Sequence, residues 1–317
     1  MTLASVCLHW SRVARSMPHY WSLLVIRDKF STQKIKDALH MAKGQFETIK
    51  LYNLSASDLV RLGKILRHAS HAVKTVYYET TESSSISGLS SLMLKPKSVI
   101  VRNEDPRGHP ITPHFGWILG STVRSLSLHR PSPKFNDWTH YVFLFRRLIS
   151  LTVTGFRFGG LCWLYHMTAI EEIILDFKDE IFDPKGNSIT RSDISLPKLR
   201  VFKLRHVYPF PTEMSIPAVR IHAPMLHTFH LDSTPAAHWL SGFAIRGAPA
   251  TLVDFRVDRP NGPTMSLHHL TPFLCDTIES FALTSVSHEL RPLLSDIEAG
   301  LILPRRKHLE FTFLDEE

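Results

Sequence analysis

The sequence contains few cysteines and no long apolar run. The three cysteines, Cys7, Cys162 and Cys275, lie more than one hundred residues apart, so they can form neither a CxxC metal-binding pair nor a disulfide framework. The longest apolar stretches have about five residues, as in 141–145, whereas a membrane-spanning helix needs about 20. His9 and Arg12 interrupt the N-terminal apolar stretch before a secretory signal could form. We therefore expect a cytoplasmic or nuclear protein that does not span a membrane.

Motifs of the common enzyme classes are also missing. The sequence has no GxSxG, P-loop, GxGxxG or HExxH motif, and the glycines of 155–160 do not have a phosphate-binding spacing. Nineteen histidines are present, but the pairs His68/His71 and His227/His230 have no third metal ligand close in sequence. We therefore expect a non-enzymatic protein with no catalytic residue, no cofactor and no bound metal.

Acidic residues are scarce in the first half of the chain. Residues 1–150 contain 21 Lys and Arg against 9 Asp and Glu, a net charge of +12, whereas residues 151–317 contain 16 against 20, a net charge of −4. A basic surface can neutralise phosphates. These basic residues are, however, spread along the chain without interleaved aromatic residues or a known nucleic-acid-binding motif. We therefore do not expect a nucleic-acid ligand.

A repeating apolar pattern runs through almost the whole chain. Segments such as LRVFKLR, LHTFHLD and LVDFRVD share the order apolar-x-x-apolar-x-apolar, and we take the last apolar residue of each as its anchor. Successive anchors are 22 to 29 residues apart. At the anchors and at the positions two and five residues before them, only Pro96 and Arg306 are not hydrophobic. The twelve anchors are Ile26, Leu51, Tyr78, Val101, Leu128, Val153, Leu175, Leu204, Leu231, Val257, Leu283 and Phe311.

The alternation around each anchor predicts a short strand with one buried face. Several connections between strands have helical periodicity; the clearest is 55–70, with Ser55 or Ser57 as its N-cap. Serines 83–85 are expected in a loop. One strand plus one helix or loop about every 26 residues is the plan of leucine-rich repeats. The alternative is a doubly wound α/β domain, whose strands usually have continuous apolar runs and Gly-rich turns.

These units resemble irregular leucine-rich repeats. The Asn or Cys that the consensus has three residues after the anchor is replaced, for example, by Pro131, Lys178, Val207 and Thr234. A regular asparagine ladder is therefore not expected, and the loops should differ between units. The expected fold is an α/β, leucine-rich-repeat-like right-handed solenoid, or horseshoe, of about 12 units over residues 21–317, with parallel strands on its concave side.

An amphipathic helix is expected in front of the first repeat, because apolar residues recur at i, i+3, i+4 and i+7 from Leu3 to Met17 before Pro18 ends it. This segment resembles the second half of an F-box, whose pattern is Val-Cys-x-x-Trp-x-x-Val/Ile-Ala, then Pro, then Leu/Tyr-Trp-Ser. The helix and strand that follow, within 31–54, also resemble those of fungal F-box-like proteins with degenerate leucine-rich repeats. The residues that match the F-box pattern are Val6, Cys7, Trp10, Val13, Ala14, Pro18, Trp21 and Ser22.

The F-box resemblance implies a substrate receptor of a cullin–RING ubiquitin ligase, with a Skp-type adaptor bound by the F-box remnant and an unknown protein substrate bound by the repeats. The Leu-Pro-x-Glu-type helix that begins an F-box is not in this sequence, so adaptor binding and the true start at Met1 stay open. Residues 1–20 could instead only cap the first repeat, as the end of a solenoid requires. The alternative function is an orphan repeat scaffold that binds a protein partner without a ligase.

The expected recognition surface is the exposed strand face of the C-terminal half. Side chains directly before and after successive anchors should form columns, because neighbouring strands lie about 4.8 Å apart and alternate side chains point the same way. These charges could recognise an extended peptide or loop, or they could pair with each other on a solubilising surface. One column contains Lys203, His230 and Arg256, and the other contains Arg205, Asp232 and Asp258.

Overall fold

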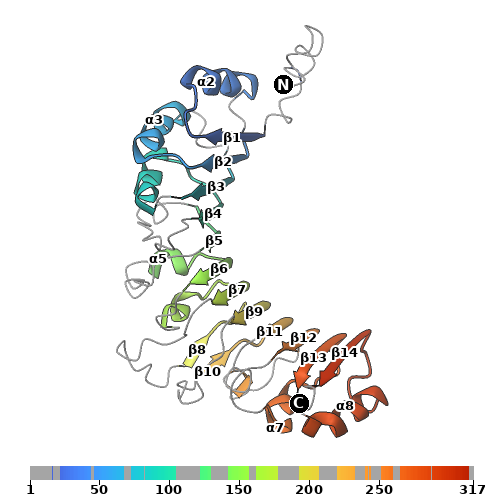
Figure 1. Cartoon of the computed structure of the whole chain (residues 1–317). Helices are drawn as coiled ribbons and strands as arrows, with labels where there is room; N and C mark the ends of the chain where they lie inside the picture. The colour runs from blue at the N-terminus through green and yellow to red at the C-terminus, as the bar shows by residue number, and fades with distance from the viewer. Residues whose placement is uncertain are drawn as a thin grey trace, which may run out of the picture. The chain divides into compact units, whose positions relative to one another are not determined.

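The computed structural model of the chain divides into two compact units, Met1–Ser132 and Pro133–Glu317, and each is described by itself (Figure 1). Both units combine parallel strands with short helices. The described residues are 16, 22–43, 46–67, 73–81, 83–104, 122–129, 142–156, 162–177, 193–206, 220–232, 240–241, 243, 251–259, 265–286 and 288–313.

The first unit contains a parallel sheet whose strands are neighbours in chain order. Helices α2 (Thr32–Met41) and α3 (Ala56–Leu66) connect the first three strands and lie on the same side of them (Figure 1). The 3-10 helix η3 (Ser83–Leu92) follows the third strand. The strands are β1 (Leu23–Arg27), β2 (Thr48–Tyr52), β3 (Thr75–Thr80), β4 (Ser98–Asn103) and β5 (Ser125–His129).

The second unit contains a parallel sheet in the order β6-β7-β9-β11-β12-β13-β14 and a separate pair, β8 (Asp193–Ser195) and β10 (Arg220–His222). The strands of the larger sheet are β6 (Ser150–Phe156), β7 (Glu172–Phe177), β9 (Val201–His206), β11 (Thr228–Asp232), β12 (Asp254–Asp258), β13 (Ser280–Val286) and β14 (His308–Phe313). The helical segments are α5 (Val142–Phe145), η5 (Cys162–His166), α7 (Leu267–Leu270), η6 (Thr271–Phe273), η7 (His288–Leu290) and α8 (Arg291–Glu298).

The twelve anchors define the strand register, as the sequence pattern predicts. In the first unit Leu51 lies opposite both Ile26 and Tyr78, and the alignment continues through β4 and β5. In the second unit Leu231 lies opposite Leu204 and Val257, and the alignment extends from β6 to β14. Strand order follows chain order in each unit, which differs from the reversal of order in a doubly wound sheet.

A backbone hydrogen-bond pattern repeats with the strands. The carbonyl oxygen of the residue just before a strand accepts two backbone N–H groups of the next repeat. One belongs to the corresponding residue and the other to the residue after it. The carbonyl of Ser22, for example, accepts from Glu47 and Thr48 at 2.9 Å each, and that of His227 accepts from Val253 at 2.9 Å and Asp254 at 3.0 Å. Ten pairs of neighbouring repeats in the described chain share this arrangement. Neighbouring repeats are therefore joined at the same backbone atoms although their loops differ.

Buried apolar side chains separate the strands from the connecting segments. Phenylalanines two residues before the anchors of β9, β11, β12 and β13 form a row in which neighbouring ring centroids lie 5.6 to 5.9 Å apart. Phe229 is fully buried in this row and also contacts Phe243 and Phe273. Each such ring contributes about 1.5–3 kcal/mol by burial before the loss of chain entropy is counted.

Helix α3 begins as the sequence predicts. The Ser55 hydroxyl accepts the Asp58 N–H at 3.1 Å and is the N-cap of α3; Ser31 has the same role for α2. The expectation of a loop at serines 83–85 is wrong, because these residues begin η3, which packs on α3. The expected helix of residues 1–20 lies outside the described residues except for Ser16.

A short polar ladder is present in the first unit, one position earlier than in the leucine-rich-repeat consensus. Asn53, Thr80 and Asn103 each follow an anchor by two residues, and Thr80 and Asn103 are buried. The Asn53 side-chain oxygen accepts the Thr81 N–H at 2.9 Å. This hydrogen bond satisfies the backbone N–H of Thr81 directly after the end of β3.

Candidate protein-interaction surface

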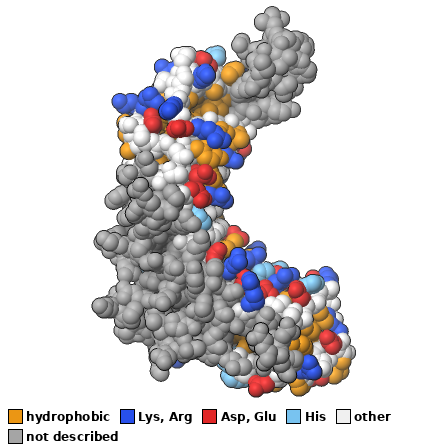
Figure 2. Space-filling view, viewed as in Figure 1, with side chains coloured by type: hydrophobic (Ala, Val, Ile, Leu, Met, Phe, Trp, Pro, Cys, Tyr) orange, Lys and Arg blue, Asp and Glu red, His pale blue; other side chains and the backbone are white. Residues whose placement is uncertain are grey.

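Strands β9, β11 and β12 of the second unit bring the six expected surface residues together. His230 lies opposite Lys203 on one side and Arg256 on the other, which confirms the arrangement of the first column. Asp232 lies in the same way between Arg205 and Asp258. Figure 2 shows basic, acidic and histidine side chains gathered over these strands. We call the six residues, together with Asp254 and Arg259, the charged strand face.

Asp232 is held between two arginines. Its carboxylate lies 3.2 Å from Nε of Arg205 and accepts hydrogen bonds from Nη2 of Arg259 at 2.9 and 3.1 Å. Arg259 follows β12 two residues after the anchor, at a φ of 46°. Sequence reasoning missed this residue, because a side chain that leaves a strand at a left-handed position does not follow the strand alternation. Within the second column, Asp232 is therefore paired with Arg205.

Asp254 links the residues of the first column. Its Oδ2 lies 2.6 Å from Nε2 of His230, and its Oδ1 lies 3.5 Å from Nε of Arg256. Asp254 stands three residues before an anchor and so shares the exposed face of the strand with the two column positions. The alternation of exposed and buried residues in the strand predicts this position for Asp254, although the expected columns contain only the residues next to the anchors.

The protonation states of this pair follow from burial and from the charges nearby. Burial lowers the pKa of His230 below its usual value, helped by the positive charges of Lys203 and Arg256, and the attraction of Asp254 only partly opposes this shift. Burial alone would raise the pKa of Asp254, but the hydrogen bond and charge of His230 lower it overall, together with Ser280 and Arg256. His230 is therefore a neutral imidazole and Asp254 a carboxylate near pH 7.

The charged strand face keeps some polar groups available for a partner. Lys203 forms no ion pair within the described part of the chain, and Arg205 is 55% exposed although it contacts Asp232. Asp258 accepts a hydrogen bond from the Thr284 hydroxyl at 2.9 Å and retains further acceptor capacity. The charged strand face therefore contains both ion pairs among its own residues and exposed hydrogen-bond donors and acceptors. This combination suits the recognition of a polar peptide or loop.

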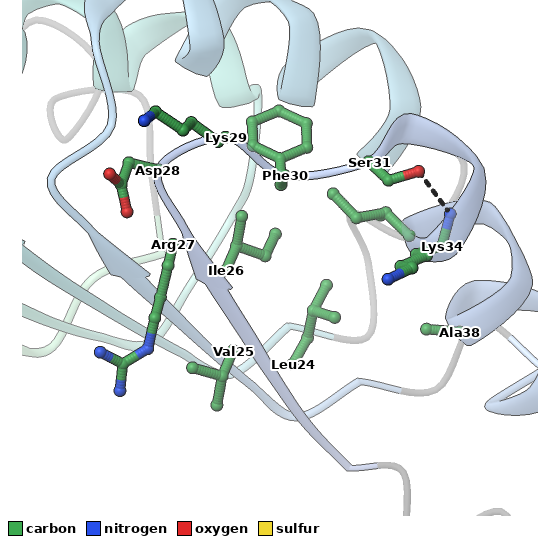
Figure 3. A pocket seen from close by; sticks show the side chains of 11 residues that line it. Leu24, Val25, Ile26, Arg27, Asp28, Lys29, Phe30, Ser31, Lys34 and Ala38 are labelled. Atoms are coloured by element: carbon green, nitrogen blue, oxygen red, sulfur yellow. Dashed lines mark hydrogen bonds between the residues drawn. The ribbon is translucent and has the colours of Figure 1, made fainter. Parts of the chain in front are cut away.

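A hollow of about 450 Å³ lies beside β1 of the first unit. Leu24 and Ile26 of β1 face helix α2, from which Ala38 points back toward the strand (Figure 3). β1 is the first strand of the sheet order, so its outer edge has no strand partner among the described residues. The expected cap or adaptor-binding residues Val6, Cys7, Trp10, Val13, Pro18 and Trp21 lie outside the described residues, so their role stays a prediction.

The described residues contain no cluster of three or more His, Cys, Asp or Glu side chains that could hold a metal ion. None of the helices in this part of the chain has the length and apolar composition needed to cross a membrane. Comparisons with protein-family models, curated proteins and solved structures gave no match to this chain.

Proposed function

We propose that the chain is a non-enzymatic protein-interaction module, an F-box-like substrate receptor of a cullin–RING ubiquitin ligase. The observation that carries this proposal is the common register of the anchors within each unit, which places exposed side chains of successive repeats in columns on the strand face. Such a surface is suited to binding an extended partner.

The repeats are proposed to stack as a right-handed solenoid of the leucine-rich-repeat type. Two features support this: strand order follows chain order in each unit, and the same carbonyl position accepts two N–H groups at successive steps. Parallel neighbours joined by helices or long loops almost always have right-handed connections. Each repeat then buries its apolar face against the next repeat, and the polar strand face remains available to a partner.

The adaptor-binding part of the proposal rests on the resemblance of residues 6–22 to the second half of an F-box. The Trp10 ring and the neighbouring apolar positions of the expected helix would contact a Skp-type adaptor. The same apolar stripe would also suit the edge of β1, where Leu24 and Ile26 line the hollow. Capping and adaptor binding therefore compete for one surface, and an experiment can separate them.

The test is a pull-down of purified Skp adaptor by the immobilised full chain, comparing the wild type with Trp10→Ala. The receptor function predicts that the wild type retains the adaptor and that the variant loses at least about tenfold in affinity, as for an aromatic hot spot. Thermal melting of both proteins is the control for a loss of folding. No adaptor retention by the wild type would contradict the receptor function and leave the orphan scaffold, and a lower melting temperature of the variant would then indicate a cap.

A further inference from the structure

The strand face of the first unit differs in chemistry from that of the second. At the positions next to the anchors, β1 to β4 present tyrosines beside basic side chains, and Figure 2 shows hydrophobic, basic and acidic side chains side by side over these strands. We call this surface the tyrosine–cation face. It consists of Arg27, Lys50, Tyr52, Tyr77 and Arg102.

The cations of this face lie over aromatic rings. The Arg27 guanidinium carbon is 5.0 Å from the centre of the Tyr52 ring, and Lys50 Nζ and the Arg102 guanidinium carbon are 5.9 and 5.7 Å from that of Tyr77. The two tyrosine rings contact each other with centroids 5.6 Å apart. Such contacts orient the long side chains without neutralising their charge.

None of these three cations forms a salt bridge with a carboxylate in the described part of the chain. On the charged strand face of the second unit, by contrast, Arg205 and Arg259 both contact Asp232. The nearest carboxylate in the columns of the first unit, Glu79, accepts the hydrogen bond of the Tyr77 hydroxyl. Burial and then Glu79 raise the pKa of Tyr77 to about 12, so the hydroxyl stays a donor to Glu79. The tyrosine–cation face therefore carries a net positive charge, with three cations against the single carboxylate of Glu79.

We propose that the tyrosine–cation face binds an acidic segment of a partner protein that runs across the strands. Carboxylates of this segment would contact Arg27 and Lys50 at one end and Arg102 at the other, and an apolar side chain between them would pack on Tyr52 and Tyr77. β1 and β4 are three strand spacings apart, about 14 Å, which an extended peptide spans in about four residues. Tyrosine and arginine are the residue types most enriched among binding hot spots.

The chemistry favours an acidic protein segment over a single-stranded nucleic acid. Successive stacked bases need ring faces that are close to parallel, whereas the Tyr52 and Tyr77 rings are tilted 48° to each other. Glu79 also places a negative charge within the surface, which repels a strand with a phosphate at every nucleotide more than it repels a peptide with an uncharged residue opposite Glu79. This inference rests on the proposed role as a protein-interaction module, but it requires neither adaptor binding nor the charged strand face.

The test measures fluorescence anisotropy of a labelled twelve-residue peptide with glutamate at every fourth position and phenylalanine between. The full chain should bind this peptide and should bind a lysine-for-glutamate version and an oligothymidylate of equal length at least about tenfold more weakly. Arg27→Ala/Arg102→Ala should weaken acidic-peptide binding at least about tenfold, because both ends of the site lose their charge. Tyr77→Phe, which keeps the ring, should change the affinity by less than about twofold.

The matched control is Lys198→Ala/Arg200→Ala, which removes two exposed positive charges from the other unit, outside the charged strand face, and should leave acidic-peptide affinity unchanged. Melting temperatures of all variants show whether each protein is folded. Equal affinity of the wild type and Arg27→Ala/Arg102→Ala, no binding of the acidic peptide, or tighter binding of the oligothymidylate would overturn the inference. The adaptor pull-down is a separate measurement. A negative pull-down would contradict the receptor function alone, and a negative anisotropy result would contradict the peptide site alone.

Discussion

A single carboxylate, that of Asp254, balances part of the positive charge on the charged strand face. Asp254 contacts His230 and Arg256, which stand on two different strands, and its carboxylate stays ionised because these groups lower its pKa against the effect of burial. Without Asp254, the column Lys203, His230 and Arg256 would consist of like-charged or chargeable groups about 4.8 Å apart along the sheet. Asp254 therefore offsets the electrostatic repulsion within that column.

The His230–Asp254 pair predicts a pH dependence of stability. Because the pKa of His230 is lowered in the folded protein, the unfolded chain takes up a proton more readily once the pH falls below about 6.5. The free energy of unfolding of the wild type, relative to His230→Gln, should therefore fall between pH 7 and pH 5. Urea denaturation at several pH values measures this difference.

The exposed His227, which directly precedes the same strand, supplies the control variant, His227→Gln, measured under identical conditions. A difference between wild type and His230→Gln that stays constant with pH would show that burial does not shift the imidazole. A difference that grows as the pH falls would mean that the charged imidazole gains more from Asp254 than it loses by burial.

At the scale of elements, the packing of α3 on η3 depends on one glycine. A Cβ atom built on Gly63 would lie 2.0 Å from the carbonyl oxygen of Ser91 and 2.8 Å from its carbonyl carbon. These are backbone atoms, so no rotamer change can relieve the overlap. In the middle of a helix glycine usually costs about 1 kcal/mol relative to alanine, and here close contact between two elements outweighs that preference.

Gly63→Ala is therefore expected to destabilise the protein, against the usual direction of this substitution in a helix. The two helices must separate to admit the methyl group, which should lower the free energy of unfolding by about 1–3 kcal/mol, as for an overpacked core. Chemical denaturation measures the change. Lys64→Ala, at the next and exposed position of α3, is the control and should change stability by no more than about 0.5 kcal/mol. A Gly63→Ala protein at least as stable as the wild type would refute the close-packing account.

Some of these connecting elements can be predicted from the sequence and others cannot. The start of α3 at Ser55 could be predicted because capping is a local hydrogen bond within three residues. The 3-10 helix η3 could not, because its serine-rich sequence has weak periodicity and its position depends on contact with Gly63. The strand pair β8 and β10 was also missed, since three residues are too short to show alternation.

At the scale of the whole molecule, the repeat spacing predicted the parallel strand order within both units. It did so because each anchor must lie next to the preceding anchor for the apolar faces to meet, and a slip of one residue would expose every anchor. The columns Lys203–His230–Arg256 and Arg205–Asp232–Asp258 follow from the same register. Their partners Asp254 and Arg259 lie outside the two positions next to the anchors, so the internal pairing of the face became evident only from the structure.

The central proposal is that the exposed strand face of the repeats binds a partner protein. The most direct measurement is quantitative affinity capture from cell extract by the full chain and by Lys203→Ala/Arg256→Ala/Asp258→Ala. We predict that the triple variant loses partner proteins that the wild type retains, while adaptor retention is unchanged and the melting temperature shifts by about 2 °C at most, because surface substitutions alter stability little. The same proteins retained in equal amounts by both would contradict the claim for the charged strand face.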